Sequence, residues 1–158
     1  MKARSTVYIE TTIPSYYHET RTTPWVRVWR AQTRRWWRYA GPQFELVTSE
    51  YVAAELKHAP EHKRAAAEQL VRGLPFLEIN DRIEALSRYY IDQLVMPDDG
   101  AGDAGHLAVA SAYGVDYLLT WNCRHLANAN KFRHIQVVND RLGLHTPMIV
   151  TPLQLMPE

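Results

Sequence analysis

Short β-rich runs alternate with helical segments along this chain, and this alternation constrains the fold more than any other feature of the sequence. Residues 7–9 are a candidate buried strand, and residues 44–47 and 76–79 are further short strands. The clearest strand covers residues 115–120, which are nearly all apolar, as a parallel strand covered on both faces should be. The alternation predicts a three-layer α/β/α fold with a mostly parallel central sheet.

Helix signals fill the intervals between these strands. We expect helices over residues 24–39, from residue 50 toward Pro60, over residues 61–72, from residue 81 to about residue 94, and over residues 103–113. Residues 96–102 form a loop, and two weaker strands are expected at residues 135–138 and 148–151. The carboxyl ends of parallel strands share one edge of the sheet, which is where ligands of such sheets bind.

Length and composition fit one domain that spans residues 1–158. The chain is 46% apolar and 22% charged, close to ordinary globular usage, which argues against a disordered or fibrous protein. The apolar run after the N-terminus is too short for a signal peptide, and no run approaches the roughly 18 residues of a membrane span. The lone Cys123 agrees with a reducing compartment. We therefore expect a cytoplasmic protein with no membrane segment.

Four segments can each deliver a polar oxygen to the carboxyl edge of the sheet. Glu10 follows the first strand, Glu55 lies on the helix after the second, and Asp103 begins its own helix. Asn122 comes just after the strand at residues 115–120. Carboxylates gathered in one place repel one another unless a cation neutralises them. Hard oxygen ligands of this kind suit Mg²⁺ or Mn²⁺ better than zinc.

The sequence motifs around these residues resemble those of one protein family. The motifs are Val7 to Thr12 (VYIETT), Thr48 to Leu56, Asp103 to Ala108 (DAGHLA), Leu118 to Asn122 (LLTWN) and Val150 to Pro152 (VTP). In this order they resemble the opening strand, the acidic motifs and the closing strand of PIN domains. Within this family, the motifs resemble those of bacterial VapC-type toxins, the ribonuclease halves of toxin–antitoxin pairs. The resemblance covers nearly the whole chain.

The resemblance implies a PIN-like fold and a Mg²⁺-dependent (or Mn²⁺-dependent) endoribonuclease that leaves 5′-phosphate and 3′-hydroxyl ends. Glu10, Glu55 and Asp103 would be the catalytic, metal-holding residues, with Asn122 as a weaker ligand. The implied partners are an RNA substrate and an antitoxin protein, and a homodimer stays open.

Two departures from the PIN pattern keep a rival interpretation open. Glu10 and Asn122 stand where most PIN domains have Asp. An amide oxygen can ligate Mg²⁺, but it carries no charge and cannot act as a base. The alternative is a catalytically weakened PIN-like module that binds RNA or protein. A structure-specific DNA nuclease of related fold is a third interpretation, against which the small size of the chain argues.

Several residues near the acids are accessory candidates. Asp99 lies four residues before Asp103 and either replaces the charge missing at Asn122 or serves as a loop and capping residue. Thr12 and Thr120 flank the expected site, where their hydroxyls can bind substrate or fix a carboxylate. His106 either approaches a phosphate or packs and makes a hydrogen bond beside the metal.

The helix at residues 24–39 carries the strongest nucleic-acid signal. Arg27, Arg30, Arg34 and Arg38 share one face at about 100° per residue, opposite a tryptophan face that we expect to pack mainly in the core. Phosphate contacts by these arginines would give salt-sensitive, sequence-independent RNA affinity. The alternatives are a surface for an acidic antitoxin and a solvated helix face.

Overall fold

A five-stranded sheet lies at the centre of the computed structural model, which describes residues 3–98 and 102–157. The strands are β1 (Thr6–Ile9), β2 (Glu45–Ser49), β3 (Phe76–Leu77), β4 (Tyr117–Leu119) and β5 (Met148–Val150). Their order is β3-β2-β1-β4-β5, and every neighbouring pair is parallel. The chain thus builds the sheet outward from β1 to β3 and then returns to the other side of β1.

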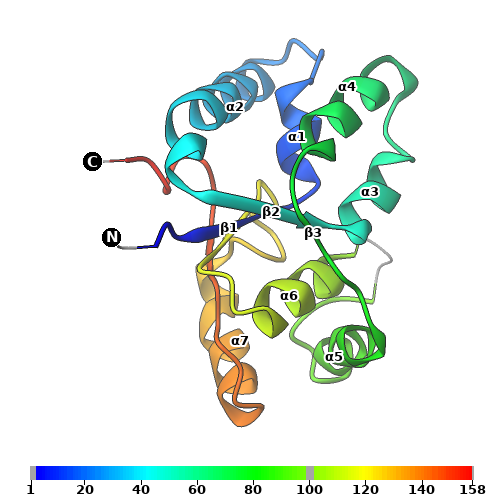
Figure 1. The fold of residues 1–158 in the computed structure, drawn as a ribbon, viewed down its shortest axis with the longest axis vertical. Coiled ribbons are helices and arrows are strands. Elements are labelled where there is room, and N and C mark those ends of the chain that lie inside the picture. Colours follow the sequence, from blue (N-terminus) through cyan, green and yellow to red (C-terminus); the bar gives the residue numbers. More distant parts are fainter. Residues whose placement is uncertain (1–2, 99–101, 158) are drawn as a thin grey trace.

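Helices cover both faces of this sheet, which confirms the predicted three-layer α/β/α fold. They are α1 (Thr12–Tyr17), α2 (Pro24–Arg35), α3 (Glu50–Leu56), α4 (Glu61–Arg72), α5 (Asp81–Asp92), α6 (Asp103–Ala112) and α7 (Ala129–Arg141). Figure 1 shows α1, α2 and α4 on one face and α5, α6 and α7 on the other. In the part of the chain that is described, no helix has the length and apolar character needed to cross a membrane.

The core lies against both faces of β1 and β4. Val7, Tyr8 and Ile9 are fully buried, and so are Leu118 and Leu119. Such side chains drive the packing, because each large apolar side chain removed from water contributes about 1.5–3 kcal/mol. Tyr8 is the exception in this set, since it brings a polar hydroxyl into the core.

Helix α6 is buried along almost its whole length because its residues are small. Asp103 through Ser111 are all buried, and a run rich in alanine and glycine lets the helix approach its neighbours closely. A Cβ atom on Gly105 would lie 2.9 Å from the ring of Tyr51, so the glycine makes room for that ring. The helix can therefore carry polar residues from its first turn directly under the sheet edge.

The strand expected at residues 135–138 is wrong, because these residues lie inside α7. The β-branched residues there suggested a strand, but the buried residues are Ile135, Val138 and Asn139, at the three- and four-residue spacing of a helix face. The side chain of Asn128 caps this helix by accepting a hydrogen bond from Asn130 N at 3.0 Å.

The expected tryptophan face of residues 24–39 is only partly correct. Trp36 is fully buried, whereas Trp25 is 52% exposed. The α-helix ends at Arg35 and continues as a π-helical turn, η1 (Trp36–Ala40), followed by a 3₁₀ turn, η2 (Gly41–Gln43). A π turn holds more residues than an α turn, so the 100° phase used in the prediction does not extend past Arg35.

Candidate metal centre

The candidate site lies at the carboxyl edge of the sheet, where β1 and β4 meet. The connection that leaves β1 runs over one face of the sheet, and the connection that enters β4 runs over the other. This is the topological switch point of the sheet, the usual position for a binding crevice. Glu10 follows β1, and its N–H donates to Leu119 O of β4 at 3.2 Å. Residues that follow both strands therefore meet at the same edge of the sheet.

Glu10 is held by two threonines. Its carboxylate atom Oε2 accepts hydrogen bonds from Thr12 N at 3.1 Å, Thr12 Oγ1 at 2.5 Å and Thr120 Oγ1 at 2.7 Å. All of these bonds end on the same oxygen, and the residue is only 3% exposed. The sequence placed both threonines beside the site, and the structure shows that they contact the carboxylate. The other oxygen, Oε1, accepts no hydrogen bond from the described residues.

The same threonines fix the turn that follows β4. Trp121 N donates to Thr12 Oγ1 at 2.8 Å, and Asn122 N donates to Thr120 Oγ1 at 2.9 Å. Each threonine hydroxyl therefore links Glu10 to the backbone of this turn. The carboxylate and the turn form one connected polar network, whose members hold each other in place.

Glu55 reaches the crevice from α3 and meets His106 of α6. Glu55 Oε1 lies 2.5 Å from His106 Nε2, and the imidazole is fully buried while the Glu55 side chain is 31% exposed. Burial lowers the pKa of His106, but the hydrogen bond to Glu55 and the charges of Glu10, Glu55 and Asp103 outweigh it. The pKa of His106 is therefore raised above its ordinary value.

A buried chain of polar groups continues from His106 into the core. His106 Nδ1 is hydrogen-bonded to the Tyr8 hydroxyl at 2.8 Å, and the same hydroxyl is bonded to Ser49 Oγ at 2.7 Å. Burial raises the pKa of Tyr8 well above its ordinary value, so the hydroxyl keeps its proton. Sequence reasoning missed Tyr8 and Ser49. The available signal was a tyrosine inside a buried strand, because a buried phenol needs a polar partner.

Glu10, Glu55 and His106 form a group that could bind a metal ion. One ligand atom from each residue lies within 4.8 Å of the others. Ligands that share one Mg²⁺ at about 2.1 Å lie at most about 4.2 Å apart, so a small closing movement would suffice. Two of the three side chains are carboxylates, which would fit a hard divalent cation.

Asp103, at the first position of α6, does not belong to this group of ligand atoms, although its charge acts on His106. It is buried, and its Oδ1 accepts a hydrogen bond from Asn122 Nδ2 at 2.9 Å. The amide oxygen of Asn122 accepts from His125 N at 3.0 Å, so Asn122 turns its N–H group toward Asp103. The metal roles expected for Asp103 and Asn122 stay predictions. Asp99, the other accessory candidate, lies outside the described residues.

The four arginines expected on one face of residues 24–39 fall into two pairs with different contacts. Arg30 Nη1 donates to Glu19 O at 2.9 Å, and Arg34 Nε donates to Tyr17 O at 2.8 Å. These two arginines tie α2 to the end of α1. Arg27 and Arg38 are exposed, and their guanidinium groups make no hydrogen bond or ion pair with any described residue. The second pair therefore has its whole guanidinium group available to an external partner.

Comparison with solved structures shows a similar fold in one chain of "Crystal structure of VapBC2 from Rickettsia felis bound to a DNA fragment from their promoter". The TM-score is 0.58 at 14% sequence identity, and the match covers 92% of this chain and 98% of that chain. At this identity the similarity concerns the fold alone. No family model and no curated protein sequence matches this chain. The architecture and this similarity together support the PIN-like fold that the sequence predicted.

Proposed function

We propose that this chain is a Mg²⁺-dependent endoribonuclease, the toxin of a toxin–antitoxin pair. The main support is the meeting of Glu10, Glu55 and His106 at the topological switch point of a PIN-like fold. Two acidic side chains brought this close repel each other, and a divalent cation would relieve that repulsion. Asp103 completes the proposed site from α6.

In this proposal Glu10, Glu55 and Asp103 hold the ion. When bound, Mg²⁺ polarises a phosphoryl oxygen and lowers the pKa of a coordinated water. Thr12 and Thr120 keep Glu10 in its ligand position. Asp103, whose Oδ1 is held by the Asn122 amide, orients the attacking water and accepts its proton.

RNA binding is assigned to the exposed part of α2 and the turn after it. Arg27 and Arg38 supply charge for phosphate contacts, and Trp25 supplies an exposed aromatic surface for base stacking. Arg21 lies over the Trp25 ring at 5.9 Å, which adds a cation beside that surface. A flexible single strand fits this combination better than a duplex.

An antitoxin partner and a cytoplasmic location belong to the same proposal. The similar chain comes from VapBC2 bound to a DNA fragment from its promoter, and the resemblance of the sequence to VapC-type toxins implies an antitoxin partner. The free, exposed Cys123 agrees with a reducing compartment. A homodimer stays open as the form of the unbound toxin.

A weakened binding module is the second candidate, favoured by the amide at Asn122. The nuclease binds and cleaves RNA, whereas the weakened module binds RNA or protein without cleaving RNA. The test is incubation of the purified protein with single-stranded RNA in Mg²⁺, with EDTA as the metal-free control. Asp103→Asn should lower the cleavage rate at least about 100-fold, while Asp140→Asn, an exposed acid on α7, should leave it unchanged. Binding without Mg²⁺-dependent cleavage would instead establish the binding module.

A further inference from the structure

We propose that His106 is a positioning residue, which holds Glu55 in its ligand geometry and does not itself bind the ion. The inference deepens the proposed metal centre and rests on it. It starts from four hydrogen bonds that connect Tyr51, Ser49, Tyr8, His106 and Glu55 in a single line. Each bond can be given a direction from the chemistry of the groups that make it.

The direction at the acidic end follows from Glu55. An ionised carboxylate only accepts hydrogen bonds, so His106 Nε2, at 2.5 Å from Glu55 Oε1, must carry a hydrogen. In the neutral imidazole the other nitrogen, Nδ1, is then an acceptor. The group that faces it is the Tyr8 hydroxyl at 2.8 Å, which must donate.

The hydrogen bonds of Ser49, at the other end of the line, can run in the same direction. A backbone N–H only donates, so Ser49 Oγ accepts from Tyr51 N at 3.2 Å. The Ser49 hydroxyl hydrogen is then available to the Tyr8 oxygen at 2.7 Å, because Tyr8 has given its own hydrogen to His106. All four donors point toward Glu55. Aligned hydrogen bonds polarise and strengthen one another in a buried site.

This arrangement leaves His106 without a lone pair for a metal. Nε2 carries the hydrogen given to Glu55, and the Nδ1 lone pair is used by Tyr8. Mg²⁺ also prefers oxygen to imidazole nitrogen. The two carboxylates of the metal-binding group are therefore ligands, and the histidine orients one of them.

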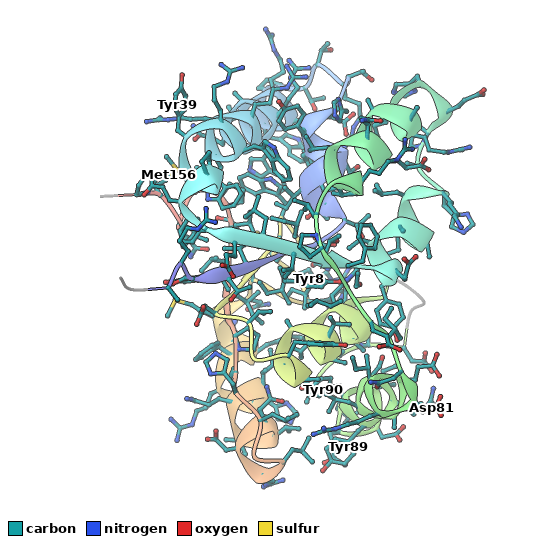
Figure 2. All side chains as sticks on the ribbon, in the orientation of Figure 1. Tyr8, Tyr39, Asp81, Tyr89, Tyr90 and Met156 are labelled. Atoms are coloured by element: carbon teal, nitrogen blue, oxygen red, sulfur yellow. The ribbon has the colours of Figure 1, made fainter. Side chains whose placement is uncertain are left out.

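The chain fixes Glu55 relative to the sheet. Tyr8 belongs to β1, and Figure 2 shows it between the sheet and α6. Ser49 ends β2 and caps α3, the helix that carries Glu55. A long glutamate side chain in a partly exposed crevice would otherwise sample several rotamers, and this line of bonds selects one. Partners that hold metal ligands in this way typically account for about 10–100-fold in metal affinity.

Two substitutions at His106 separate positioning from ligation. His106→Gln places an amide N–H near the former Nε2 and keeps the bond to Glu55, whereas His106→Leu removes it. Titration calorimetry with Mn²⁺ should give His106→Gln an affinity within about 3-fold of wild type and His106→Leu one that is 10–100-fold weaker. Equal losses in the two variants would overturn the inference.

The tautomer of the wild-type ring gives a second test that needs no variant. At a pH where the ring is neutral, ¹⁵N NMR of the metal-free protein should show His106 protonated at Nε2, and the Nε2–H signal should persist when Mg²⁺ is added. Protonation at Nδ1, or loss of the Nε2–H signal with Mg²⁺, would overturn the inference. Tyr8→Phe, which removes the donor to Nδ1, should weaken Mn²⁺ binding about 10-fold.

These readouts distinguish the inference from the proposed function. If wild type binds no Mn²⁺ and cleaves no RNA, the proposed function fails, while the tautomer still decides the direction of the hydrogen-bond chain. If wild type binds Mn²⁺ and His106→Leu binds it equally well, the positioning role alone fails.

Discussion

At the scale of single residues, the structure depends on side chains that are small and on buried polar groups whose hydrogen bonds and ion pairs are all made. Gly102 shows the first condition, because it has a φ of 77° and precedes Asp103 at the start of α6. A Cβ atom at this position would lie 2.5 Å from Glu55 Oε1. Only glycine combines that backbone conformation with such a close approach to the carboxylate.

We predict that Gly102→Ala displaces Glu55 and weakens Mn²⁺ binding at least 10-fold. The positive φ adds a destabilisation of about 1–2 kcal/mol, which urea unfolding would measure. Gly73→Ala is the matched control, because Gly73 has a φ of −81° and no atom within 4 Å of the added Cβ. Wild-type Mn²⁺ affinity in Gly102→Ala would show that Glu55 is not a ligand in the position seen here.

Glu19 illustrates a fully satisfied buried acid outside the site. Its carboxylate binds Arg21 at 3.0 Å and Lys63 at 3.2 Å, and Lys63 is also buried. Arg21 and Lys63 together outweigh the effect of burial and lower the pKa of Glu19 from 4.5 to about 2. A lowered folded-state pKa contributes stability that is present above the unfolded pKa and is lost as the pH falls through the folded pKa.

We therefore predict that Glu19→Gln loses about 1–3 kcal/mol of unfolding free energy at pH 7. The difference from wild type should shrink as the pH falls from 4.5 and vanish near pH 2. Urea unfolding at a series of pH values measures it, with the exposed Glu78→Gln as the control. A difference that is the same at pH 7 and pH 2 would exclude the ion pairs as its cause.

At the scale of elements, α2 has two roles that the sequence pattern did not separate: it packs against neighbouring segments, and it presents side chains to solvent. The pattern placed its arginines on one face, but Arg30 and Arg34 hold α1 by donating to backbone carbonyls. The ring of Trp29 stacks on the ring of Trp121, with 4.5 Å between the ring centroids. Trp121 is the residue that follows Thr120. The helix thereby supports the turn at the metal centre with one side and presents Arg27 and Trp25 to solvent with another.

We predict that Arg27→Gln/Arg38→Gln weakens binding to all single-stranded RNAs alike. Each lost phosphate contact should lower the slope of log affinity against log salt by about 0.7, so the pair should lower it by about 1.4. Arg133→Gln/Arg141→Gln on α7, across the sheet in Figure 1, is the control. Unchanged slope together with escape from the antitoxin would assign this surface to the protein partner.

At the scale of the whole molecule, the sequence predicted the architecture well because local and global signals agree. Residues 115–120 are nearly all apolar, and β4 (Tyr117–Leu119) within this range lies between β1 and β5 in the sheet. The position of Glu10 after a buried strand placed it at the carboxyl edge without any long-range information. These features follow from periodicity and from parallel-strand geometry alone.

The parts that could not be predicted depend on packing between distant segments. The contact of His106 with Tyr8 joins residues 98 positions apart, and nothing in either local pattern specifies it. The β-branched side chains of Ile135 and Val138 suggested a strand. Both side chains are instead buried on one face of α7, and this packing favours the helix. The π turn at η1 had no recognised signal, and it ended the regular phase of α2.

We predict that divalent metal stabilises the entire fold, because the proposed ligands follow β1 and lie on α3 and α6. Mn²⁺ at 100 times its Kd should add about 2.7 kcal/mol, or roughly 5–10 °C in Tm for a chain of this length. Thermal unfolding with and without Mn²⁺ measures the shift, and Glu55→Gln should reduce it. An identical shift in Glu55→Gln would place the stabilising ion elsewhere.

The most direct test of the central claim is an anomalous-scattering map from crystals grown with Mn²⁺. The account predicts one strong peak at about 2.1 Å from carboxylate oxygens of Glu10, Glu55 and Asp103, with His106 Nε2 still bonded to Glu55. A peak bound to His106 Nε2 would contradict the positioning role. No peak at these carboxylates, at Mn²⁺ concentrations that support RNA cleavage, would contradict the metal centre itself.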